Sequence, residues 1–206
     1  MESFFNKETV NDLKEHITSG AGGERGWKFN KTGLPTATTE NSDHRVNFGD
    51  PSLIDGGYHN HTTFGAKTFS ATDIKTLINI ARYNGVGDPS NAFMGVIIPG
   101  GMHYVIRFDG SQGDLPPLIV FPNGEIDSFS KKQINDWNKE QWRDYQDLIL
   151  KPNMTMNEKI EKIFFDTITK MGLGNKMILQ KIDDANNKVY TIHKNPNGTT
   201  TSVPCN

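Results

Sequence analysis

The sequence predicts an α/β (α+β) fold in which a mixed β-sheet is flanked by helices and followed by a C-terminal helical and β-hairpin appendage. Residues 73–83 carry apolar side chains at helical spacing, which predicts an amphipathic helix. Residues 92–98 form an apolar run of strand length, and residues 103–108 alternate between apolar and polar. A Pro-Gly-Gly turn separates these two segments, so we expect a hairpin through a central sheet. Residues 130–171 have the pattern of two consecutive helices.

The composition excludes several classes of protein. The chain has 206 residues, enough for one large domain or for one domain with an appendage. Its 22 basic and 24 acidic residues are well mixed and form no Lys/Arg block, so no nucleic-acid partner is expected. No apolar run approaches the roughly 18 residues that a membrane-spanning helix needs. Cys205 is the single cysteine, which excludes an internal disulfide and a cysteine-rich zinc site.

The N-terminal segment, MESFFNKE, lacks the basic and apolar regions of a signal peptide. We therefore expect a cytoplasmic location if the chain is complete. If the chain belongs to a longer protein or a complex, this argument says nothing about the parent, and secretion stays open.

The remaining elements follow from local patterns of apolar residues, glycine and proline. A boundary near residue 128 divides the expected fold into residues 1–128 and an appendage of unknown role, residues 129–206. In the first part we expect a helix over 7–19, a strand over 24–30, a loop over 34–43, short strands over 45–48 and 118–121, a strand over 53–61, and a helix end at Asn84-Gly85. In the second part we expect helices over 130–150 and 157–171, a C-cap at Gly172, strands over 177–182 and 188–193, and a turn at Asn197-Gly198.

Two histidines at alternate positions end the expected strand over 53–61. Because residues two apart on a strand face the same side, His59 and His61 point together. Imidazole suits zinc, and a catalytic zinc site usually has three protein ligands. Asp73 lies in the first turn of the next helix and is the candidate third ligand. Ser70 precedes it by three residues, where its hydroxyl can donate to an oxyanion.

This pattern resembles the signature of the JAMM (MPN-plus, or JAB-like) zinc metalloproteases, His-x-His followed by Ser-x-x-Asp at a helix start. The resemblance covers roughly residues 5–110 and also requires a glutamate on an earlier strand, a position that Glu24 fits. It implies an MPN/JAB-like fold in which His59, His61 and Asp73 bind Zn²⁺. It further implies that Glu24 is the general acid/base for the zinc-bound water and that Ser70 helps to stabilise the oxyanion.

The family cleaves peptide or isopeptide bonds, including those of ubiquitin-like proteins, and it has bacterial members. The resemblance therefore implies a metallopeptidase or isopeptidase with a peptide or ubiquitin-like protein substrate. We expect specificity to come from the loops over 34–39 and 109–117 and from the C-terminal appendage.

The sequence departs from the family pattern at three points. Thr62 stands where the family usually has proline, the spacer from His61 to Ser70 is one residue longer, and the interval from Glu24 to His59 is short. These departures leave open a catalytically silent MPN-like interaction module. A zinc hydrolase acting on a non-peptide amide is a third interpretation.

Each candidate residue also has a structural interpretation. Ser-x-x-Asp before an apolar helix is a capping signature, so Ser70 and Asp73 can serve the helix alone. Glu40 is a rival to Glu24, but it lies in a Thr-rich loop. His-Asn-His also spells the name of a nuclease family, whose three residues are not consecutive. Structural or surface roles are expected for His44 and His103, a place in the core or cleft wall for Trp27, and helix packing for Trp137 and Trp142. Cys205 is at too exposed a position, with no partner histidine, to be a nucleophile.

Overall fold

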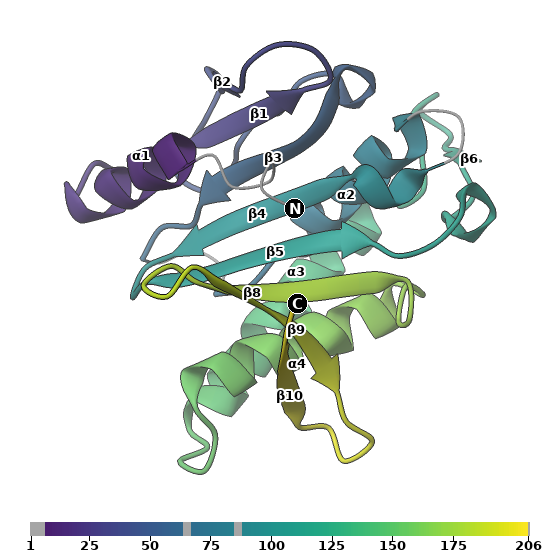
Figure 1. The fold of residues 1–206 in the computed structure, drawn as a ribbon. Coiled ribbons are helices and arrows are strands. Elements are labelled where there is room, and N and C mark those ends of the chain that lie inside the picture. Colours follow the sequence, from purple (N-terminus) through teal and green to yellow (C-terminus); the bar gives the residue numbers. More distant parts are fainter. Residues whose placement is uncertain (1–6, 64–66, 85–87, 206) are drawn as a thin grey trace.

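The computed structural model describes residues 7–63, 67–84 and 88–205. Over these residues the protein is a mixed α/β fold with four α-helices, an eight-stranded sheet and a separate two-stranded sheet (Figure 1). The predicted combination of a mixed sheet with flanking helices is confirmed.

The large sheet has the strand order β10-β9-β8-β5-β4-β3-β1-β2. Neighbouring strands pair antiparallel except β3 and β4, which pair in parallel with Tyr58 opposite Gly95. A parallel pair needs a crossover connection, and helix α2 supplies it. The strands are β1 (Gly26–Asn30), β2 (Thr36–Ala37), β3 (Ile54–Asn60), β4 (Phe93–Ile98), β5 (Met102–Phe108), β8 (Met177–Asp183), β9 (Lys188–Lys194) and β10 (Thr200–Pro204).

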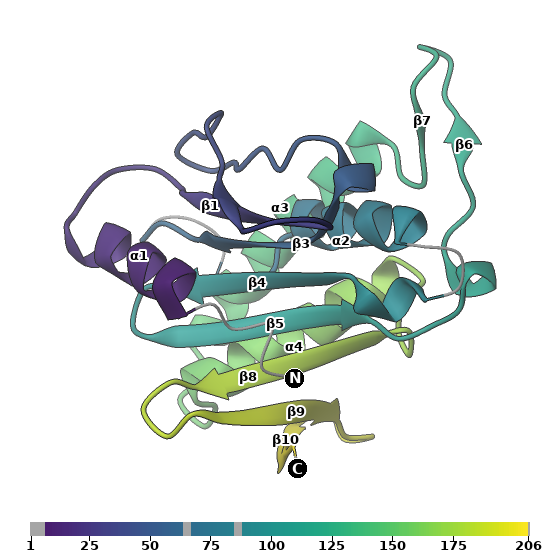
Figure 2. The ribbon, with the colours of Figure 1, turned by 45° about the horizontal axis from the view of Figure 1, so that its top comes forward.

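The helices cover the two faces of this sheet unequally, as Figures 1 and 2 show. Helix α1 (Lys7–Thr18) covers one face at β3 and β4. Helices α2 (Ala71–Tyr83) and α4 (Met156–Lys170) cover the opposite face, and α3 (Lys131–Ile149) packs against both of them. Short 3₁₀ turns lie at Pro51–Leu53, Pro89–Asn91 and Gln112–Asp114. None of the helices in the described part of the chain is both long and apolar enough to cross a membrane.

Strand β4 is buried on both faces, which explains its continuous apolar sequence. Met94, Val96 and Ile98 join the larger core under α2 and α4. Phe93 and Ile97 join a smaller core under α1. Burying each side chain of this size contributes about 1.5–3 kcal/mol to stability. Because β4 contributes to both cores, it is the central strand of the fold.

Several short elements differ from the prediction. Residues 45–48 form no strand, because Val46 and Phe48 pack onto glycines of the sheet and the backbone does not pair with an edge strand. A Cβ on Gly57 would lie 2.3 Å from the ring of Phe48, and one on Gly26 would lie 2.3 Å from Val46. Strands β2 and β10 were not predicted, nor was β7 (Ile126–Asp127), which pairs with β6 (Ile119–Val120).

The sheet and the larger core both cross the predicted boundary near residue 128. Strand β8 pairs with β5 along Met177–Lys181, so the C-terminal strands continue the sheet. Ile160 and Phe164 of α4 share one core with Ile74 and Leu77 of α2. Residues 129–206 therefore help to form the environment of α2.

Helices α2 and α4 end close to the positions that the sequence predicts. Helix α2 ends at Tyr83, and the N–H of Asn84 donates to the carbonyl of Ile80. Gly85, the other half of the expected stop signal, lies outside the described residues. Gly172 follows α4 with φ of +76°, a conformation that favours glycine over residues with a side chain.

Candidate metal centre

The two histidines emerge together at the C-terminal end of β3. His59 lies in the strand, and His61 follows it while its N–H still donates to the carbonyl of Ile97 at 2.9 Å. Both side chains are almost completely buried. The alternation of the strand turns both to one side, as the sequence predicted, and this side is the face that carries α2.

Asp73 reaches the histidines from the first turn of α2. Ser70 is the N-cap of this helix, and its N–H and Oγ each donate to Asp73 Oδ2 at 2.8 Å. In return, the N–H of Asp73 donates to Ser70 Oγ at 3.1 Å. This capping box occupies Oδ2 and leaves Oδ1 facing His59. The capping role and the ligand role of Asp73 are therefore compatible.

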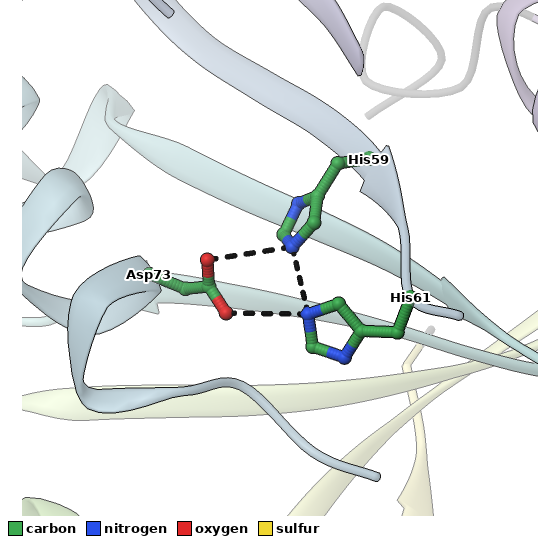
Figure 3. Close-up of side chains that lie close together, drawn as sticks. All are labelled: His59, His61 and Asp73. Carbon is green, nitrogen blue, oxygen red and sulfur yellow. Dashed lines mark hydrogen bonds and ion pairs between the residues drawn. The ribbon is translucent and has the colours of Figure 1, made fainter. Parts of the chain in front are cut away.

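The three side chains converge on one point (Figure 3). The Nε2 atoms of His59 and His61 are 2.9 Å apart, and each lies 3.4 Å from a carboxylate oxygen of Asp73. Ligands about 2.0–2.1 Å from a tetrahedral zinc lie about 3.3 Å from one another. The His–Asp separations match this spacing and the His–His separation is slightly shorter, so this buried group could hold a metal ion.

The electrostatics of the group also favour a cation. Three atoms that carry lone pairs meet in a buried space, and a proton or a metal ion must lie among them to offset their repulsion. Burial alone would raise the pKa of Asp73, but the adjacent His59 and His61 outweigh it and hold that pKa well below its usual value. Asp73 is therefore a carboxylate at neutral pH, the form that binds metal.

Glu24 lies just before β1 and lines the same cavity as His61 and Asp73. Burial raises the pKa of Glu24 to about 8; His61 lowers it and Asp73 raises it, both to a smaller extent. A carboxyl group that titrates near neutral pH can both accept and donate a proton during a reaction.

Asn60 holds the backbone on either side of Glu24. Its Oδ1 accepts from the N–H of Arg25 at 2.7 Å, and its own N–H donates to the carbonyl of Arg25 at 3.1 Å. His16 of α1 contacts the carbonyl of Gly23 at 3.2 Å. The supporting roles of Asn60 and His16 were not predicted from the sequence. For Asn60 the only clue is strand alternation, which turns its side chain away from the histidines and toward this segment.

Helix α3 holds the start of α2 in the same way. The amide oxygens of Asn138 and Gln141 accept from the N–H of Ala71 at 2.8 and 3.2 Å. Gln141 Nε2 also donates to the carbonyl of Phe69 at 2.9 Å, and Asn138 Nδ2 donates to Thr72 Oγ1. These contacts span 66–72 positions along the chain, so no local pattern could have predicted them.

The metal-binding group opens into a cavity of about 510 Å³, a typical size for a ligand site. His44 and Trp142 also line it, although the sequence analysis assigned them surface and packing roles. Trp137 packs edge to face on Phe129 at 5.3 Å, in agreement with its predicted packing role.

The other residues weighed in the sequence analysis are not among the described residues that line this cavity. Glu40 is exposed and accepts from Asn47. Trp27 donates its indole N–H to Asp12 at 2.7 Å. His103 is buried on the opposite face of the sheet, where it contacts Asp184. Cys205 is half-buried, with its Sγ 3.2 Å from Thr191 Oγ1.

Comparisons with known proteins do not place the chain in a family. Neither a family model nor a curated protein matches the sequence. The functional argument therefore rests on the geometry of the site and on the motif that the sequence carries.

Proposed function

We propose that this protein is a zinc-dependent hydrolase of JAMM type that cleaves a peptide or isopeptide bond. The observation that carries the proposal is the convergence of His59, His61 and Asp73 at the edge of a cavity that His61, Asp73 and Glu24 line. The order of elements supports it as well, with a helix, a glutamate before a strand, a strand ending in His-x-His, and a helix capped by Ser-x-x-Asp.

Zinc is the metal that this donor set favours. Two imidazole nitrogens and one carboxylate oxygen form a common set for catalytic zinc, whereas calcium and magnesium prefer oxygen ligands alone. His59, His61 and Asp73 would hold the ion. When bound, zinc supplies a Lewis acid that makes water nucleophilic near neutral pH.

Glu24 supplies the proton transfers of the proposed reaction. Its carboxylate accepts a proton from the attacking water, and the resulting carboxylic acid gives a proton to the leaving amine. Its raised pKa means that both forms are accessible near neutral pH. Asn60 is a positioning residue, because it fixes the backbone that carries Glu24 and does not touch the reacting atoms.

Ser70 has a role as the cap that orients Asp73, and its predicted oxyanion role stays a prediction. The Ser70 hydroxyl donates its proton to Asp73 Oδ2. To stabilise an oxyanion it must leave that carboxylate and turn into the cavity.

One observation favours a catalytically silent MPN-like interaction module as the second candidate. Thr62 stands where the family usually has proline, and its hydroxyl is buried with no hydrogen-bond partner among the described residues. A buried hydroxyl without a partner next to His61 is compatible with a scaffold that keeps its fold but has lost its activity.

Metal analysis is the first test. Protein purified without chelator should contain about one zinc per chain, and dialysis against a chelator should remove it. Protein that contains no metal and takes up none on addition of Zn²⁺ would exclude the hydrolase.

The second test separates the two candidates with Glu24→Gln. The variant should keep its zinc, and its cleavage of ubiquitin-like fusions and random peptide pools should fall by about 10²–10⁴-fold. Glu40→Gln is the matched control and should retain wild-type cleavage. If wild-type protein with a full zinc complement cuts no member of either substrate set, the interaction module is the better interpretation.

A further inference from the structure

The cavity beside the metal-binding group is lined by side chains of different chemistry. Arg45 and Lys67 are basic, and α3 contributes Asn138, Gln141, Trp142 and Tyr145. Since Asn138 and Gln141 also bind the start of α2, the aromatic pair is held at a fixed position relative to Asp73. The C-terminal part of the chain thus contributes directly to whatever the cavity binds.

The aromatic pair is an unfilled apolar surface. Trp142 and Tyr145 stack with ring centroids 6.0 Å apart and an interplanar angle of 29°, yet Trp142 is 51% exposed. Trp137, on the same helix, is instead packed against the core. Tryptophan and tyrosine supply much of the binding energy at contact surfaces, because large rigid rings cover area at low entropic cost.

Outside the proposed catalytic centre, the charges in the cavity have one sign. Glu24 and Asp73 are the only acidic residues among the described residues that line it, and both belong to that centre. The basic side chains outside the centre are those of His44, Arg45, Lys67 and Lys75.

Two of these cations have no carboxylate partner in the described structure. Lys75 pairs with Asp127, whereas Lys67 donates to the carbonyl of Thr63 and no ion pair forms at Arg45. A cavity with this charge attracts a ligand that carries a carboxylate.

We infer that the cavity selects a peptide segment that combines a bulky apolar side chain with an acidic residue. The apolar side chain packs on Trp142 and Tyr145, and the carboxylate binds near Arg45 and Lys67. This inference rests on the proposed peptidase function and specifies its substrate class.

Binding is measured separately from cleavage, with zinc-loaded Glu24→Gln protein and three fluorescein-labelled decapeptide pools. The first pool fixes Leu or Phe beside Asp or Glu at its centre, the second fixes the same apolar residues beside Lys, and the third fixes Ala beside Asp or Glu. Fluorescence anisotropy should show at least fivefold tighter binding of the first pool than of either other pool.

Variants in the Glu24→Gln background assign the preference to residues. Adding Trp142→Ala should weaken binding of the first pool about tenfold and leave the third pool unchanged. Adding Arg45→Glu should weaken the first and third pools about threefold to tenfold and spare the second. The control is Tyr83→Ala, because Tyr83 is also aromatic and 51% exposed but does not line the cavity; it should change nothing.

The outcomes of the two assays separate this inference from the proposed function. Selective binding without cleavage by the wild type would support the substrate class and overturn the peptidase. Cleavage of all three pools at equal rates, or selectivity that survives Trp142→Ala and Arg45→Glu, would overturn the substrate class and leave the peptidase standing. Absence of both binding and cleavage would overturn both. Retained zinc content shows that each variant is folded.

Discussion

The central sheet carries a histidine–carboxylate cluster on each face, and the two clusters differ in how fully they are paired. On the α1 face, His103 contacts Asp184 at 3.0 Å through Nδ1 and the hydroxyl of Tyr58 at 3.3 Å through Nε2. On the α2 face, the Nε2 atoms of His59 and His61 face each other at 2.9 Å. His59 Nδ1 has no hydrogen-bond partner among the described residues.

The same residue types thus serve two purposes. In the His103 cluster, both nitrogens of the buried imidazole contact protein side chains, which is typical of a structural network. In the His59 cluster, atoms with lone pairs converge beside a cavity that His61 and Asp73 line, and a proton or a metal ion offsets their repulsion. Completeness of pairing, more than burial or residue type, distinguishes a candidate metal site from a core histidine here.

The largest expected difference between the clusters concerns zinc affinity. His61→Ala removes a ligand, so the dissociation constant for Zn²⁺ should rise by at least a hundredfold. His103→Ala should change it by less than threefold. Isothermal titration calorimetry of both metal-free variants measures this directly, and a similar loss in the two would remove the distinction between the clusters.

The pH dependence of stability should have opposite sign on the two faces. In the metal-free protein, the pKa of Glu24 is raised to about 8 by burial. Its stabilising contribution is therefore complete below about pH 4.5 and is lost as pH rises toward 8, by up to a few kcal/mol. Burial lowers the pKa of His103, so its contribution is present above about pH 6.5 and is lost as pH falls.

Urea unfolding between pH 5 and 9 in the presence of a chelator measures both trends. Glu24→Gln should abolish the loss that Glu24 causes as pH rises toward 8, and it should leave the separate loss that His103 causes on acidification. A wild-type free energy of unfolding that rises steadily from pH 5 to 8 would contradict the assignment of a buried, protonated Glu24.

The paired cluster should matter more for stability than for metal binding. Tyr58→Phe removes the contact between the Tyr58 hydroxyl and His103 Nε2, which should lower the free energy of unfolding by about 0.5–1.5 kcal/mol. Zinc affinity should be unchanged. Chemical denaturation of the metal-free protein, followed by a zinc titration of the same sample, provides both values; a stability equal to that of wild type would show that the hydroxyl contact is dispensable.

The smallest expected effect comes from α3, which acts on the metal-binding group through backbone contacts. Gln141→Ala removes two hydrogen bonds to the start of α2, and zinc affinity should fall about threefold to tenfold. Gln146→Ala, at an exposed position on the same helix, is the control. Equal zinc affinity for both variants would mean that the α2 start keeps its position without α3.

The sequence was sufficient for the local part of the site. Strand periodicity placed His59 and His61 on one side, and the capping pattern placed Asp73 in a first helical turn. It was not sufficient for the supporting contacts, because Asn138 and Gln141 meet α2 through pairings nearly 70 positions apart. Trp142 was misassigned for a related reason, since helical periodicity does not show which side of a helix faces a cavity.

The fold, like the site, has parts that the sequence predicts and parts that it does not. Long segments with clear periods, such as α2, β4 and β5, were predicted. Strand β10 was missed because its sequence, TTSVP, is polar and mostly exposed, so no apolar alternation marks it. Strand β7 consists of two residues and has no pattern to detect. Residues 45–48 alternate like a strand, but the bare faces of Gly26 and Gly57 draw their side chains onto the sheet.

The parallel pairing of β3 with β4 has a consequence for engineering this scaffold. A crossover helix between parallel strands begins at the edge where the first strand ends, so the C-terminus of β3 and the N-terminus of α2 are neighbours by topology. The capping box fixes one side of the connection and the β-ladder fixes the other. The positions of His61 and Asp73 are therefore set by β3 and by the cap of α2, so an engineered variant must preserve these two elements to keep the metal-binding group.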